Sequence, residues 1–249
     1  SFSDGGKFNS VDEALKHALE MVEEGADIID LGGESTRPGH IYVDVDYVDV
    51  DEELKRVIPV VKKLKEELDT PISVDTYKAK VADESLKLGA EMINDIWGLR
   101  KDKDMANVIA KHNAYVCIMH NQDGTEYDKD IIESIKEFLL ESVDIAIEAG
   151  IDKNKIVLDP GIGFGKTYEQ NLEVLKRLGE LKTLGYPILL GTSRKSVIGN
   201  TLNLPPQERV EGTIATTVLG IRDGVDIVRV HDVEKNLRAA KMADAIYRV

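Results

Sequence analysis

The chain contains 249 residues with a formal net charge of −14, from 32 basic and 46 acidic side chains. This acidic balance argues against a general nucleic-acid or anionic-membrane surface, because phosphate binding requires clustered Lys and Arg. No apolar stretch reaches membrane-spanning length, no signal peptide opens the chain and a single Cys117 excludes an internal disulfide, so we expect a cytoplasmic protein.

Seven short runs rich in Val, Ile and Leu are expected to form strands. Apolar and polar residues do not alternate strictly in them, as is typical of strands that are buried on both faces of a parallel sheet. In chain order they cover residues 26–36, 71–76, 91–96, 115–120, 155–160, 186–195 and 225–232. Each run carries a polar or charged residue at or near its end, where a strand would meet a loop.

Eight segments with helical periodicity alternate with these runs. They cover residues 10–25, 51–68, 78–90, 102–113, 130–150, 167–185, 205–224 and 232–249. Ser10 and Glu13 predict a capping box at the start of the first segment, and Pro59 predicts a kink in the second.

The alternation predicts an α/β fold, a (β/α)8 TIM barrel, as a single domain over residues 1–249. Because eight helices accompany seven strands and a helix comes first, we expect the first strand of the barrel to be missing from this sequence. The loop insert at 40–50 alternates apolar and acidic residues and predicts a short exposed ribbon without an assigned function.

The glycine-rich stretch at 158–167 matches neither common nucleotide-binding motif. A P-loop needs Gly five residues before its second Gly, but Pro160 precedes Gly165 at that distance. A dinucleotide fingerprint needs Gly three residues after its second Gly, and after Gly163 that position is Lys166. We interpret the stretch as a βα loop that lets the backbone approach a ligand.

Other common catalytic motifs are also missing from the sequence. The five His residues include no i, i+4 pair, so a zinc site is not expected. No G-x-S-x-G elbow indicates a hydrolase. Any divalent ion would be Mg²⁺ held largely by ligand phosphates.

Two carboxylates and an amide end three different apolar runs: Asp75, Asn94 and Asp159. Such a set suits a flat heterocycle with several N–H donors, such as an aminopyrimidinone. Each could equally be a cap or turn residue, and Asp95 is an alternative to its neighbour Asn94.

A second set of strand-end residues is basic: Arg37, Lys195, Arg229 and His231. Arg229 and His231 are two apart on the last expected strand and would share a face. Cationic side chains at a barrel mouth suit a diphosphate or a leaving phosphate. Ser196 after Lys195 could bind a carboxylate at the start of a helical turn, or simply cap that turn.

With these residues in place, the chain resembles the dihydropteroate synthase family of folate biosynthesis. The resemblance covers essentially the whole chain through segments in matching order: SFSDGG (1–6), DLGGESTRPG (30–39), SVDTYK, INDI, IMH, LDPGIGFGKT, GTSRKS and VRVHD. A barrel alone would not dictate such strings. The resemblance implies condensation of 6-hydroxymethyl-7,8-dihydropterin diphosphate with p-aminobenzoate, giving dihydropteroate and diphosphate, and a target of sulfonamides.

The resemblance also implies roles for single residues. The pterin would be held by Asp75, Asn94, Ile96, Met119, Asp159, Lys195 and Arg229. The diphosphate would meet Thr36, Arg37, Arg229 and His231. The p-aminobenzoate site would consist of Phe2, Thr36, Pro38, Phe164 and Ser196. Catalysis would depend on Asp75, Asp159, Lys195, Arg229 and His231.

The resemblance further implies Mg²⁺ as cofactor and a homodimer. The Asn that the family uses for Mg²⁺ is expected upstream of Ser1, so none of the residues 1–249 is assigned to the metal.

Three rival functions stay open from the sequence. A methyltetrahydrofolate methyltransferase shares the barrel and the pterin pocket but has no use for a diphosphate site. A non-catalytic or truncated pterin-binding barrel is favoured if the first strand is absent. A sugar-phosphate isomerase barrel would leave the acids and the amide unexplained.

Overall fold

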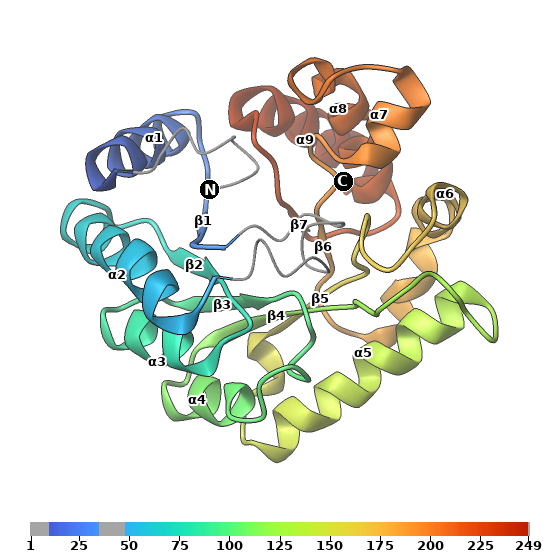
Figure 1. Ribbon diagram of the computed structural model, residues 1–249. Coiled ribbons are helices and arrows are strands. Elements are labelled where there is room, and N and C mark those ends of the chain that lie inside the picture. The colour runs from blue at the N-terminus through green and yellow to red at the C-terminus, as the bar shows by residue number, and fades with distance from the viewer. Residues whose placement is uncertain (1–9, 35–47, 249) are drawn as a thin grey trace. The chain divides into compact units, whose positions relative to one another are not determined.

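The computed structural model describes residues 10–34 and 48–248 (Figure 1). The chain forms two compact units, Ser1–Ile118 with Ser142–Ile156, and Met119–Glu141 with Val157–Val249. The predicted ribbon at 40–50 lies outside the described residues, apart from its last positions, which lead into a helix. No helix in the described ranges combines the length and the apolar character that a membrane span requires.

The first unit alternates helices with parallel strands. Its elements are α1 (Val11–Glu23), β1 (Ile29–Gly32), α2 (Val50–Glu67), β2 (Ile72–Asp75), α3 (Ala79–Lys87), β3 (Met92–Asp95), α4 (Met105–Lys111) and β4 (Tyr115–Met119). Strands β1 to β4 pair in chain order, all parallel. Figure 1 shows α2, α3 and α4 following one another beside these strands.

Local sequence explains why these elements begin where they do. Ser10 caps α1: its Oγ accepts from the Glu13 N–H at 3.2 Å, and the Glu13 carboxylate accepts from the Ser10 N–H at 3.3 Å. This confirms the predicted capping box. Every residue of β2 and β3 is buried, as expected for central strands covered on both faces.

The second unit contains the rest of the alternation. Its elements are α6 (Tyr168–Lys176), η2 (Leu178–Leu184), β6 (Leu189–Leu190), α7 (Ser196–Leu202), η3 (Pro206–Glu208), α8 (Val210–Arg222), β7 (Ile227–Val228) and α9 (Val233–Tyr247). Helix α5 (Ile131–Glu148) and strand β5 (Ile156–Asp159), which follows η1 (Lys153–Lys155), contribute residues to both units, as does β4, whose last residue Met119 belongs to the second unit. Strands β6 and β7 pair in parallel, and Leu158 of β5 bridges to Ile188.

Two predicted helices and the number of helices need correction. The helix expected at 167–185 ends at Lys176 and continues as the 3-10 helix η2. The Arg177 N–H donates to both Glu173 O and Val174 O, and after it the Glu180 N–H donates to Arg177 O, three residues back. The helix expected at 205–224 starts only at Val210, after η3. The described residues contain nine α-helices rather than eight, because the segment after Lys195 forms α7.

The last two strands are shorter than predicted. Pairing between β6 and β7 ends at Leu190 and Val228, since the chain leaves the sheet at Gly191. Arg229 and His231 therefore lie after β7 and not on it, which corrects the expectation that they share a strand face. The Arg229 N–H still donates to Leu190 O at 3.0 Å, so Arg229 stays attached to the strand end.

Candidate active site

The first unit brings together two of the predicted polar residues. Asp75 ends β2 and pairs in register with Asn94 of β3, and both side chains are buried. The two residues are therefore neighbours on adjacent strands, near the carboxyl ends of both. Asn94 Oδ1 accepts no hydrogen bond from any described residue, so the first-unit pair offers an acceptor that a ligand N–H could satisfy.

Asp95, the alternative to Asn94, has a structural role. Its fully buried carboxylate accepts from the Trp97 N–H at 2.8 Å and the Leu99 N–H at 3.0 Å. Leu99 has a left-handed φ of 66°, so the carboxylate stabilises an uncommon turn. Burial raises the pKa of Asp95 to about 6, although both N–H groups oppose this.

In the second unit, three predicted residues converge on one point beside Gly191. A methyl group placed on Gly191 would lie 3.8 Å from Lys195 Nζ, 4.0 Å from Asp159 Oδ2 and 4.0 Å from the Arg229 Cβ. These residues come from the end of β5, the loop after β6 and the segment after β7. This second-unit cluster thus combines one acid with two cations at the ends of neighbouring strands.

The electrostatics of the cluster depend on Asp159. Burial raises the pKa of its carboxyl above the ordinary value, and Lys195 is the strongest opposing influence. The Gly161 N–H, which donates to Asp159 Oδ1 at 2.7 Å, opposes it next, followed by Lys166 and Arg229. A buried carboxylate among cations is a frequent feature of binding sites.

The glycine-rich loop after β5 is folded around Lys166, a residue without a predicted role. Lys166 Nζ donates to Gly161 O and Phe164 O at 3.0 Å each and lies 2.9 Å from His120 Nδ1. Gly161 is required here, because it has φ +70° and a Cβ on it would lie 1.9 Å from His120 O. The available sequence signal was a single lysine near the end of the glycine-rich stretch 158–167.

Lys195 and Phe164 lie side by side. Lys195 Nζ is 4.8 Å from the centre of the Phe164 ring and donates to Ile162 O. Phe164 is buried in the glycine-rich loop. Two predicted apolar contacts are also buried: Ile96, directly after β3 in the first unit, and Met119, at the end of β4 in the second.

His231 is oriented by a serine. Its Nδ1 lies 2.7 Å from Ser193 Oγ, and its backbone N–H donates to the same oxygen at 3.1 Å. Ser196 is the exposed first residue of α7, whereas Lys195 occupies the N-cap position without a side-chain bond. Ser196 is therefore not the helix cap that the alternative interpretation expected.

Four predicted residues, Phe2, Thr36, Arg37 and Pro38, lie outside the described residues. Within the described ranges, no three His, Cys, Asp or Glu side chains are placed to hold a metal ion. The described residues therefore do not form a Mg²⁺ site of their own.

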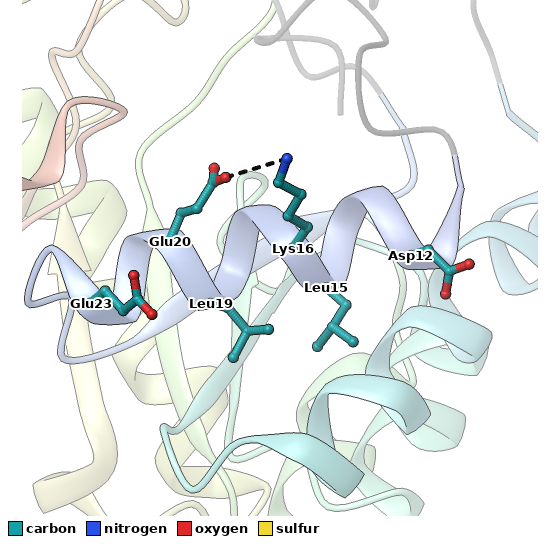
Figure 2. Close-up of a pocket in the computed structure, with 6 residues that line it drawn as sticks. All are labelled: Asp12, Leu15, Lys16, Leu19, Glu20 and Glu23. Carbon is teal, nitrogen blue, oxygen red and sulfur yellow. Dashed lines mark ion pairs between the residues drawn. The ribbon is translucent and has the colours of Figure 1, made fainter.

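The surface hollow on α1 is a poor alternative site. Figure 2 shows that all its lining residues come from this one helix, with Leu15 and Leu19 on the same side. The Lys16–Glu20 ion pair, at 3.9 Å between Nζ and Oε1, is solvent-exposed. Such a hollow lacks the buried convergent polar groups of a catalytic site.

Comparison with known proteins connects these residues to a family. Residues 1–231 match the family model described as pterin binding enzyme. A dihydropteroate synthase from Clostridium beijerinckii is 60% identical over 249 residues, which cover 100% of this chain and 90% of the relative.

Solved structures agree with this finding. A dihydropteroate synthase from Clostridium difficile, crystallised in the presence of pteroic acid, is 71% identical with a TM-score of 0.94, covering 100% of this chain and 92% of that one. A Yersinia pestis dihydropteroate synthase in complex with a sulfonamide drug is 43% identical with a TM-score of 0.92, covering 99% and 89%. The agreement confirms the predicted α/β barrel class.

Proposed function

The chain belongs to the dihydropteroate synthase family of pterin-binding enzymes, and we propose how its residues carry out the reaction of that family. The reaction condenses 6-hydroxymethyl-7,8-dihydropterin diphosphate with p-aminobenzoate and gives dihydropteroate and diphosphate. The relatives from Clostridium beijerinckii, Clostridium difficile and Yersinia pestis are all dihydropteroate synthases, which favours this activity over methyl transfer and sugar-phosphate isomerisation.

The convergence of Asp159, Lys195 and Arg229 beside Gly191 carries the proposal. A pterin presents N–H donors on one edge and a carbonyl oxygen on another. Asp159 accepts from the donors, Lys195 donates to the ring acceptors, and Arg229 stacks on the ring face. Asp75 and Asn94 bind further edge groups of the pterin, and Ile96 and Met119 provide apolar contacts.

The buried carboxylates also stabilise the transition state. When the bond between the pterin CH₂ and the diphosphate oxygen breaks, the electron pair leaves with the diphosphate and positive charge develops on the pterin. Asp159 and Asp75 stabilise that charge, and Arg229 and His231, with Thr36 and Arg37, stabilise the departing diphosphate.

The amine of p-aminobenzoate then forms the new C–N bond and loses a proton. Because the protein mainly positions two reactants, it needs no covalent intermediate. Phe164 and Ser196, with Phe2, Thr36 and Pro38, form the arylamine site. Since the Yersinia pestis relative was crystallised with a sulfonamide drug, we expect sulfonamides to compete with p-aminobenzoate here.

Two further features belong to the proposal. Mg²⁺ would accompany the substrate diphosphate and neutralise part of its charge. The active form would be a homodimer, as the family resemblance implies, and sedimentation velocity would measure this directly.

An assay of diphosphate release that requires both substrates tests the residue roles. We expect Asp159→Ala and Arg229→Ala to lose about 100-fold or more in kcat/KM for the pterin, because each removes a charged group that acts in the transition state. Asp128→Ala and Arg238→Ala are matched controls, since both side chains are exposed. Undiminished turnover in Asp159→Ala or Arg229→Ala would refute its assignment, and pterin binding without diphosphate release would identify a non-catalytic binder.

A further inference from the structure

The loop between β6 and α7 holds Lys195 through an uncommon backbone conformation. Arg194 has φ +58°, in the left-handed region that non-glycine residues rarely occupy. Such a conformation persists only where the surrounding structure holds it. The contacts of Arg194 therefore bear on how Lys195, the next residue, is placed.

The guanidinium of Arg209 provides one of these contacts and bonds two further carbonyls, those of Lys195 and Leu204. Its Nη1 donates to Arg194 O at 2.9 Å and to Lys195 O at 3.2 Å, and its Nε donates to Leu204 O at 2.8 Å. Arg209 is itself anchored as the N-cap residue of α8, where its carbonyl accepts from the Thr213 N–H at 2.9 Å. One planar cation thus joins both ends of α7 to the start of α8.

Gly199 makes room for this guanidinium. A Cβ on Gly199 would lie 2.2 Å from both Cζ and Nη2 of Arg209 and 2.6 Å from its Nε. Gly199 lies inside α7 and does not have a positive φ, so its backbone conformation does not require glycine. The space taken by Arg209 is the physical reason for a glycine here.

The opposite side of the loop is held by the segment after β7. The Arg194 side chain pairs with Asp232, with 3.0 Å between Nη2 and Oδ1, and Ser193 Oγ binds His231 Nδ1. These contacts restrain side chains, whereas Arg209 restrains the two carbonyls that flank the Cα of Lys195. Arg209 thus adds a side-chain donor to the Lys195 carbonyl, which also accepts from the Ile198 and Gly199 N–H groups at 3.2 Å each.

We propose that Arg209, seated against Gly199, is a positioning residue that holds Lys195 in the orientation needed to bind the pterin. This inference rests on the proposed role of Lys195. It assigns Arg209 no contact with either substrate.

Steady-state kinetics of single and double variants test the proposal. Arg209→Ala should raise KM for the pterin diphosphate about tenfold, the effect of one or two lost hydrogen bonds to a charged group, with little change in KM for p-aminobenzoate. Gly199→Ala should have the same effect, because its methyl group displaces the guanidinium. The double variant should be no worse than Arg209→Ala, whereas independent effects would multiply to about 100-fold.

A second double variant separates positioning from simple stabilisation. If Arg209 acts through Lys195, Arg209→Ala should not raise KM for the pterin further in a Lys195→Ala background. Additive effects there, or pterin KM values unchanged in Arg209→Ala, would overturn the inference. No effect of Lys195→Ala alone would instead refute the proposed function of Lys195.

Controls and a milder change complete the design. Arg222→Ala lies in the same helix α8 with an exposed side chain, and Gly179→Ala introduces a methyl group with ordinary contacts of 3.6 Å or more. Arg209→Lys keeps the charge but loses the planar fork, and should show an intermediate KM. If Arg209→Ala and Arg209→Lys both fail to fold, Arg209 supports the whole unit and the positioning role is wrong.

Discussion

At the scale of single residues, burial determines how the two carboxylates Asp159 and Asp95 titrate. Asp159 lies at the end of β5 with Lys195, Lys166 and Arg229 as stabilising charges. The buried carboxylate of Asp95 instead accepts hydrogen bonds from two backbone N–H groups. Both pKa values are raised, but only Asp159 belongs to the proposed pterin site.

Binding of the pterin should weaken as the pH falls. Because burial raises the pKa of Asp159, its carboxylate takes up a proton at a higher pH than the ordinary range near 4. The protonated form loses charge attraction and one acceptor for the pterin N–H groups. Measured between pH 5 and 8, KM for the pterin should rise on the acid side. The Asp159→Asn variant should lack this acid limb, and an identical limb in that variant would contradict the prediction.

Asp95 should make stability depend on pH. Its folded-state pKa of about 6 exceeds the ordinary value. The contribution of Asp95 to the free energy of unfolding is therefore fully present below about pH 4 and is lost as the pH rises through 6. Asp95→Asn cannot ionise, so its stability relative to wild type should improve by up to about 3 kcal/mol between pH 4 and 7. Urea denaturation at pH 4, 5.5 and 7 measures this difference, which would stay constant if Asp95 did not titrate in that range.

At the scale of elements, the glycine-rich loop after β5 depends on one internal lysine. Lys166 holds the carbonyls of Gly161 and Phe164 together, and thereby shapes the loop that carries Phe164. Burial lowers the pKa of Lys166 to about 7, while Asp159 raises it. The three contacts of its Nζ use every N–H of an ammonium group.

Lys166→Met should destabilise the protein by about 2–4 kcal/mol, because two buried carbonyls lose their shared N–H donor. Urea denaturation at pH 7 measures the free energy of unfolding. Lys153→Met, which changes an exposed lysine before β5, is the matched control and should have an effect near zero. Equal stability of the two variants would show that the carbonyls find other donors.

At the scale of the whole molecule, the two units share secondary-structure elements. The division falls inside β4, α5 and β5, and not in linkers. Neither unit can therefore lose its structure without disrupting an element of the other, and we propose that residues 1–249 behave as one domain.

Unfolding should accordingly be one cooperative transition. Trp97 is the only tryptophan of the sequence and lies in the first unit, so its fluorescence reports on that unit, whereas circular dichroism reports on all helices. The two urea curves should have the same midpoint. A later or earlier circular-dichroism transition without a fluorescence change would show that the second unit unfolds independently.

Much of the fold was predictable because its signals are local. The Ser10 capping box and the buried runs of β2 and β3 depend on neighbouring residues, and they formed as expected. The break at Arg177 and the short β6 and β7 were not predictable, because they follow from hydrogen bonding and pairing that the apolar pattern does not encode.

The sequence by itself determined the class of the fold, the family and the identity of the polar strand ends, since these depend on residue order and periodicity. The tertiary structure decided which of them meet: Asp75 with Asn94 by strand register, and Asp159 with Lys195 and Arg229 beside Gly191. It also decided the roles of Lys166 and Arg209, whose partners are carbonyl groups. A carbonyl is present at every residue, so only packing selects the ones that a cation binds.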